Sequence, residues 1–201
     1  MKKLPVLLLL ALLALFLTSC EDDDVPPAEN EEETITNVTL TFEPEGGGTP
    51  VTATWVDADG EAGNAPPVIS DITLAANTTY TLDIDLINAI DPNNPESITE
   101  EVDAEAQEHM FFFGWTDGLF SSPTGDGNLG AGNRNDPVNY EDFDKSDGKF
   151  PLGLETTWTT GGPATGTFRV LLAHQPDEKS ATSDSTTGEP DVDITWDVTV
   201  Q

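Results

Sequence analysis

The sequence predicts an all-β protein, an antiparallel β-sandwich of immunoglobulin-like or transthyretin-like type with one short helix. Two observations carry this prediction. Apolar, aromatic and β-branched residues alternate with polar residues along several short segments, and Gly, Pro and Asn separate these segments. In addition, the chain lacks the strand–helix–strand rhythm of a parallel sheet. Its 201 residues suffice for one domain with extensions.

The alternation defines about eight strands. In the clearest one, residues 191–200, the even-numbered positions are apolar and the odd-numbered positions are Asp or Thr, so the two sets face opposite ways. Residues 152–159 and 166–174 are expected to pair around the turn Thr160-Gly161-Gly162-Pro163. The remaining predicted strands are 38–42, 51–55, 72–74, 80–86 and the aromatic run 110–115.

One helix is expected between the strands. Ser97-Ile98-Thr99-Glu100 is a capping box, and acidic residues follow in the first turn, where they complement the helix dipole. Ile98, Val102 and Ala106 form a narrow apolar stripe at a spacing of four. The prediction is a helix that starts after Ser97 and ends at His109.

The N-terminus reads as an export signal with a lipid attachment site. Lys2 and Lys3 precede an apolar run over 4–17, which as a helix would be about 21 Å long and too short for the ~30 Å hydrocarbon core. Leu17-Thr18-Ser19-Cys20 resembles the lipobox of bacterial lipoproteins, whose Cys is acylated. We expect a signal peptide over 1–19 and a membrane anchor on Cys20; the alternative is an ordinary signal peptide with an incidental Cys.

An acidic segment follows the anchor. Residues 21–34 hold eight acids and two prolines and are too polar to form a core, so 20–34 is predicted to be a disordered tether and 35–201 the β domain. Acids directly after the lipidated Cys resemble the surface-export signal of Bacteroidetes lipoproteins. The expected location is the outer membrane, facing the cell exterior; the alternative is its periplasmic face.

Charge excludes one class of partner. The chain has 7 basic and 38 acidic residues, a net charge of −31, and removal of 1–19 leaves −33. Nucleic acid is excluded as a partner, because binding phosphates needs clustered Lys and Arg. The body cannot lie on anionic lipid by charge either, so the membrane is reached through Cys20 alone.

The order of features is similar to a group of small flavobacterial-type lipoproteins of unknown function. The resemblance rests on 74–88, LAANTTYTLDIDLIN, on 98–113, ITEEVDAEAQEHMFFF, and on 153–179 and 191–201. Some members carry the label "type 1 periplasmic binding fold". The resemblance implies an envelope lipoprotein and supplies neither an activity nor site residues.

Two histidines are the most specific candidate ligands. His109 and His174 lie in distant segments and could together hold a transition metal or a haem iron. The alternative is that each histidine closes its own element, since His109 falls at the expected helix C-terminus.

A second candidate metal site is the turn 57–61, where Asp57, Asp59 and Glu61 alternate. Oxygen-rich loops suit Ca²⁺. The spacing is not that of an EF-hand, because Ala62 stands where the required Gly would be. The alternative is a tight acidic turn.

Aromatic residues beside the long loop 116–139 suggest a carbohydrate site. Trp115, Phe120 and Tyr140 flank this loop, which is rich in Gly, Asn and Asp. The alternative is that these side chains belong to the core. No nucleophile motif or phosphate-binding loop is present, so the chain is not expected to be an enzyme.

The leading prediction from sequence is a lipid-anchored envelope protein that binds a ligand or partner. The candidate partners are a polysaccharide and another protein. The alternatives are a metal or haem carrier that uses the two histidines and a structural envelope lipoprotein. Calcium and haem are the cofactors to test.

Overall fold

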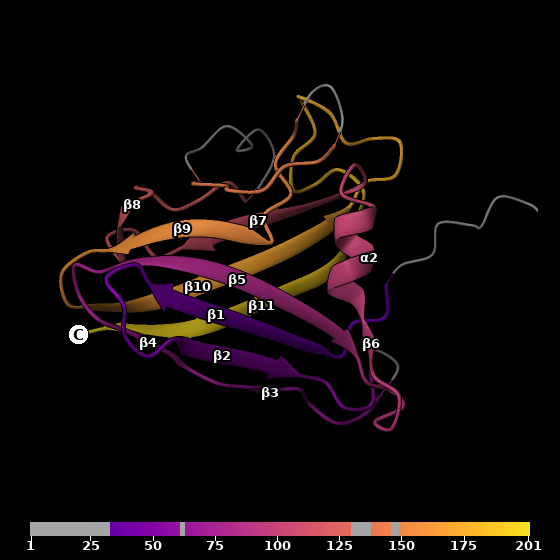
Figure 1. Cartoon of the computed structure of the whole chain (residues 1–201), viewed down its shortest axis with the longest axis horizontal. Helices are drawn as coiled ribbons and strands as arrows, with labels where there is room; N and C mark the ends of the chain where they lie inside the picture. Colours follow the sequence, from indigo (N-terminus) through magenta and orange to yellow (C-terminus); the bar gives the residue numbers. More distant parts are fainter. Residues whose placement is uncertain (1–32, 61–62, 130–137, 146–148) are drawn as a thin grey trace, which may run out of the picture. The chain divides into compact units, whose positions relative to one another are not determined.

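The structure, a computed structural model, describes residues 33–60, 63–129, 138–145 and 149–201. It is an all-β fold with one short helix, as the sequence predicts. Two sheets form the layers of a sandwich, and the helix α2 (Ile98–Ala104) lies at one end of them (Figure 1).

The larger sheet has the strand order β3-β2-β1-β5-β9-β8, with β6 added beside β5. Its neighbouring strands are antiparallel throughout. In chain order these strands are β1 (Asn37–Pro44), β2 (Val51–Val56), β3 (Val68–Ile69), β5 (Thr79–Asn88), β6 (Glu96–Ser97), β8 (Phe120–Ser122) and β9 (Glu155–Thr160).

The smaller sheet has the order β4-β11-β10-β7. Its strands are β4 (Ile72–Leu74), β7 (His109–Trp115), β10 (Ala164–His174) and β11 (Glu189–Val200). The pairs β7–β10 and β10–β11 are antiparallel, whereas the short edge strand β4 runs parallel to β11.

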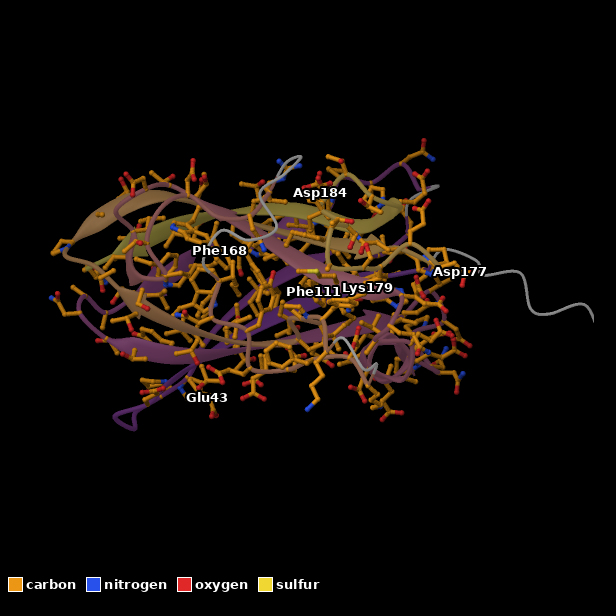
Figure 2. All side chains as sticks on the ribbon, turned by 90° about the horizontal axis from the view of Figure 1, so that it is seen from above. Glu43, Phe111, Phe168, Asp177, Lys179 and Asp184 are labelled. Carbon is orange, nitrogen blue, oxygen red and sulfur yellow. The ribbon has the colours of Figure 1, made fainter. Side chains whose placement is uncertain are left out.

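The core between the sheets follows from the two-residue period of the strands. Inward side chains of β7 and β10 meet those of β1, β5 and β9, and aromatic rings fill the centre: Trp158 lies 5.0 Å from Phe168 and 5.5 Å from Phe113 between ring centroids. Figure 2 shows Phe111 and Phe168 inside the body and Glu43 at its rim. The even-numbered positions of β11 from 192 to 200 are buried, as predicted.

One predicted strand pair is wrong. The segments around Thr160-Gly161-Gly162-Pro163 become β9 and β10, but these strands do not pair, because the turn passes from one sheet to the other. Thr156, Trp158 and Thr160 face one core layer from the larger sheet, and the inward residues of β10 face it from the smaller sheet. Alternation shows which face of a strand is buried but leaves its partner open.

The helix is shorter than predicted. Ser97 caps it, with its hydroxyl accepting from the Glu100 N–H at 3.4 Å, and Ile98, Val102 and Ala106 are buried as expected. The helical segment ends at Ala104, however, and a turn leads directly into β7. His109 is therefore the first residue of a strand rather than the last residue of the helix.

Candidate metal centre

The two histidines lie directly opposite each other on neighbouring strands. His109 opens β7, His174 closes β10, and the antiparallel register pairs the two residues. They share the inward face with Phe111 and Leu172, because side chains alternate along each strand. The imidazole rings are stacked, with centroids 4.5 Å apart and planes 5° from parallel. They form the last layer of the inter-sheet core.

The carboxylate of Glu33, from a third segment of the chain, lies beside both imidazole rings. Glu33, just before β1, places Oε1 3.0 Å from His109 Nε2 and Oε2 3.8 Å from His174 Nδ1. The side chains are almost inaccessible: 0% of His109, 4% of His174 and 5% of Glu33 is exposed. Sequence analysis assigns Glu33 to the acidic tether, yet its carboxylate belongs to this buried cluster.

The end of the helix contributes the fourth group. Glu105, the C-cap of α2, offers a carboxylate oxygen, and the ligand atoms of Glu33, Glu105, His109 and His174 all lie within 4.8 Å of one another. The Glu105 carbonyl oxygen also lies 3.2 Å from His109 Nδ1. A hydrogen bond there places the proton of a neutral imidazole on Nδ1, which leaves the Nε2 lone pair directed at the carboxylates.

Asp191 adds a second buried carboxylate beside the histidines. Its Oδ2 lies 3.7 Å from His109 Nε2 and its side chain is fully buried. Alternation predicts that Asp191 faces outward with Asp193, and this prediction is wrong. The register with β10 skips Asp191: Leu172 pairs with Val192, and Ala173 pairs with Pro190. This β-bulge leaves Asp191 as the extra residue and redirects its side chain.

Burial and mutual charge set the protonation of the cluster. Burial raises the pKa of Asp191 to about 8, and the neighbouring Glu33 carboxylate contributes to this rise. Burial also disfavours the charged forms of His109 and Glu33. In each case, however, the interactions with charged neighbours outweigh the effect of burial. Glu33 and Asp191 hold the pKa of His109 above its ordinary value, and the two histidines hold the pKa of Glu33 below its ordinary value. At neutral pH the cluster therefore holds protons that a cation can displace.

The donor set suits a divalent transition metal. Two imidazole nitrogens and two carboxylate oxygens are a familiar ligand combination for Zn²⁺, with bond lengths of about 2.0–2.2 Å. Tetrahedral ligands at such bonds lie about 3.3 Å from one another, so the most widely separated ligand atoms, up to 4.8 Å apart, must approach by up to about 1.5 Å around an ion. Without a metal ion, His109 Nε2 is 3.0 Å from Glu33 Oε1, whereas Glu33 Oε2 is buried without a hydrogen bond from the described residues; a metal ion would bind Nε2 and satisfy Oε2.

A haem iron does not fit between these rings. An iron held by two histidines needs the porphyrin between them, with each ring meeting the metal by its nitrogen edge. His109 and His174 instead stack face to face at 4.5 Å and are buried. The two stacked rings therefore leave no room for a porphyrin between them, and the group of ligand atoms that the structure brings together is one for a single metal ion.

A buried lysine binds the turn that leads into His109. Lys179 donates from Nζ to the carbonyl oxygens of Ala106 at 2.6 Å and His109 at 2.7 Å, and it lies 3.7 Å from the Asp144 carboxylate. Figure 2 shows Lys179 inside the body and Asp184 at its rim. Lys179 fixes the turn between α2 and β7 and with it the position of His109.

In the turn 57–61, the candidate calcium site, a carboxylate is engaged in hydrogen bonds with the backbone. The Asp59 carboxylate accepts from the backbone N–H groups of Asn64 at 2.8 Å and Ala65 at 3.1 Å, which lower its pKa. Asp57 lines a cavity of about 360 Å³ together with Glu33 and Asp191, and Glu61 lies outside the described residues. The described part of this turn does not gather three carboxylates.

The predicted carbohydrate platform is part of the core. Trp115 is 5% exposed and Phe120 is 4% exposed, and their rings pack edge-to-face. Tyr140 is half-buried, and its hydroxyl donates to the Phe111 carbonyl at 2.7 Å and accepts from Asn128 Nδ2 at 2.8 Å. These three side chains form no exposed aromatic surface on which a sugar ring could stack.

Cys20, the signal peptide 1–19 and most of the tether 20–34 lie outside the described residues. Within the ranges that the structure does describe, no helix is long and apolar enough to cross a membrane.

Comparison of the chain with protein-family models, with curated proteins and with solved structures gives no match.

Three of the five groups in the cluster, Glu33, Glu105 and Asp191, were not predicted from the sequence. Glu33 is one acid among eight in its segment, and Asp191 follows the alternation of its strand. Glu105 carried a signal, because a Glu four residues before a His is a common ligand spacing on or beside a helix.

Proposed function

We propose that this chain is a lipid-anchored envelope protein whose β-sandwich binds a divalent transition metal, with Zn²⁺ as the reference ion. The observation that carries the proposal is the convergence of two buried histidines and two carboxylates, with ligand atoms within 4.8 Å, at one end of the sandwich. These groups come from three separate segments of the chain, and the buried setting keeps water from competing for them.

Several features support binding over a purely structural role. Stacking two imidazoles against a carboxylate desolvates charged groups, which costs free energy unless a strong partner is present. A metal ion repays that cost directly. The cluster also has the outer contacts that metal-binding histidines usually have, since His109 Nδ1 meets the Glu105 carbonyl.

Calorimetric titration of the body from residue 33 onward with Zn²⁺ tests the proposal. We expect one saturable site, at least about 100-fold weaker binding in His109→Gln and His174→Gln, and clear weakening in Glu105→Gln. Glu101→Gln is the matched control, because Glu101 is exposed one helical turn earlier and makes the same change in charge. Equal binding by His109→Gln/His174→Gln and wild type would refute the metal site.

Thermal unfolding gives a second readout that does not depend on calorimetric heat. At a free zinc concentration 100 times Kd, binding stabilises the fold by about 2.7 kcal/mol, which for a body of this size raises Tm by about 5–11 °C. The increase should vanish in the double histidine variant. Binding should also strengthen as pH rises, since His109 and Asp191 must release protons.

The proposal includes the lipid anchor and the outer-membrane location that the sequence predicts. The lipobox-like Leu17-Thr18-Ser19-Cys20 and the acidic residues after it support acylation of Cys20 and exposure on the outer membrane. Mass spectrometry of the mature N-terminus tests this. Acyl chains on Cys20 are expected, and a bare Cys20 or its loss with residues 1–19 would contradict it.

A further inference from the structure

One edge of the smaller sheet is open beside β11. The short strand β4 pairs with β11 only over Val198–Val200 (Figure 1). Just before β4 the chain lies against the larger sheet instead, because the Ser70 N–H donates to the Thr54 carbonyl oxygen of β2 at 3.0 Å. Among the described residues, no strand pairs with the edge of β11 that precedes Val198 and faces away from β10.

The main chain of β11 presents hydrogen-bonding groups to this open edge. At the end of the strand the Gln201 N–H donates to the Leu74 carbonyl oxygen at 3.0 Å, so the main-chain groups of Gln201 face the β4 side. Every second residue of a strand directs its main chain to the same side, which places the N–H and C=O groups of Asp193 and Thr195 at the open edge. No described residue forms a hydrogen bond with these groups, and the main chain of an added strand would pair with them.

The larger sheet has apolar side chains beside this edge that the smaller sheet does not fully cover. On β2, Trp55 lies two residues after the buried Ala53, and Ile69 of β3 is opposite Trp55 in the register, so all three side chains face the smaller sheet. Ile69 is nonetheless 44% exposed, and a cavity of about 360 Å³ is lined by both Trp55 and Ile194 of β11. One further strand beside β11 would cover this apolar surface.

The outer face of β11 indicates the charge of a strand that would pair here. Asp193, Thr195 and Asp197 point outward and are exposed. On the other side of β11, β10 places Arg169 opposite Thr195, and the Arg169 guanidinium donates twice to Asp193 at 2.6 Å. Opposite charges on neighbouring strands are favourable and like charges are not, so a strand with outward Lys or Arg suits the open edge. A second copy of this chain, with its net charge of −31, is the less suitable partner.

We propose that the open edge of β11 binds an extended segment of a partner protein in which apolar and basic residues alternate. The main chain of this segment pairs with Asp193 and Thr195, and its apolar side chains cover Trp55 and Ile69. In this mode of recognition, main-chain hydrogen bonds give affinity and alternate side chains give specificity. The groups that it uses are separate from the metal ligands, so this inference goes beyond the proposed function and does not rest on it.

Calorimetric titration of residues 20–201 at physiological salt tests the proposal with a synthetic peptide of about five residues, in which lysine and isoleucine alternate and both ends are blocked. We expect saturable binding, and at least tenfold weaker binding when glutamate replaces every lysine. Of two peptides N-methylated at alternate residues, one should bind at least tenfold more weakly, because only one set of N–H groups faces β11. Binding that is unchanged by glutamate, or by methylation of either set, would overturn the proposal.

Substitutions at Thr195 test the same pairing from the side of the protein. Thr195→Pro removes the N–H at the open edge and leaves the hydrogen bonds between β10 and β11 in place, because this N–H points away from β10. Peptide binding should weaken at least tenfold in Thr195→Pro and remain unchanged in Thr195→Val, the matched control at the same exposed position. Equal binding by the two variants would overturn the proposed pairing.

Hydrogen exchange gives a readout that does not depend on how the proline variant folds. In the wild type, exchange of the Thr195 amide should slow at least tenfold at saturating peptide, and unchanged exchange there would overturn the placement. His109→Gln/His174→Gln should lose zinc binding and keep peptide binding, so the failure of one proposal can be told from the failure of the other. Sedimentation that shows a dimer of this chain, abolished by Thr195→Pro, would overturn the choice of partner.

Discussion

Replacing Lys179 by Met should destabilise the fold strongly, although the side chains have similar length. The Lys179 ammonium is fully buried, donates to two carbonyl oxygens at 2.6 and 2.7 Å, and lies 3.7 Å from the Asp144 carboxylate, which is 1% exposed. Removing one partner of a buried ion pair costs about 3–5 kcal/mol. For a domain of this size that lowers Tm by about 6–20 °C.

Urea denaturation of the purified body measures this loss. Lys145→Met is the matched control, because Lys145 and Asp103 also lie 3.7 Å apart but their side chains are 75% and 62% exposed. Exposed pairs contribute little, so the control should change stability by less than about 0.5 kcal/mol. Lys179→Met/Asp144→Asn removes both charges and should recover at least about 1 kcal/mol relative to Lys179→Met.

A loss below about 1 kcal/mol in Lys179→Met, or a loss no greater than that of Lys145→Met, would refute the reasoning. Additive effects of the two single substitutions in the double variant would also contradict the ion pair. Either result would mean that the interior near Lys179 is better hydrated than its burial indicates.

Three further predictions concern the same end of the sandwich and its supports. Asp191 has a pKa of about 8 in the folded state against an ordinary 3.8, so the native state binds more protons than the unfolded state. Stability from Asp191 is thus present at low pH and falls as pH rises from about 4 to 8; Asp191→Asn should remove this slope in urea midpoints taken across that range, and parallel pH profiles would contradict it. Gly188→Ala should lower the free energy of unfolding by at least about 2 kcal/mol in thermal unfolding, because Gly188 has φ +76° and a Cβ there would overlap the carbonyl oxygen of His174. An unchanged Tm would show that the loop can shift to make room for the Cβ. Tyr140→Phe should cost about 1–3 kcal/mol in urea denaturation, since the Phe111 carbonyl loses its donor; a neutral effect would mean that water replaces the hydroxyl.

Sequence patterns predicted the layers of the fold better than their connections. The alternation in β1, β5 and β11 gave their buried faces correctly, because one buried face is enough to set a two-residue period. The partner of β9 could not be predicted in this way, since a Gly-Gly-Pro turn serves equally for a hairpin and for a crossing between sheets.

The candidate site was predictable only in part for related reasons. His109 and His174 were identified as a pair because they are the only two histidines, and the register of β7 with β10 supplied their contact. Asp191 depended on a β-bulge, which the residue pattern does not reveal. Glu33 is one of many acids in its segment, so its role emerges only once the chain before β1 is seen against the histidines.

X-ray absorption at the zinc edge of the zinc-loaded body would identify the ligands of the metal directly. We expect a first shell of two imidazole nitrogens and two carboxylate oxygens at about 2.0–2.2 Å, with the outer-ring scattering that imidazoles produce. The imidazole signal should disappear in His109→Gln/His174→Gln. A first shell of oxygen alone in the wild type would contradict the account.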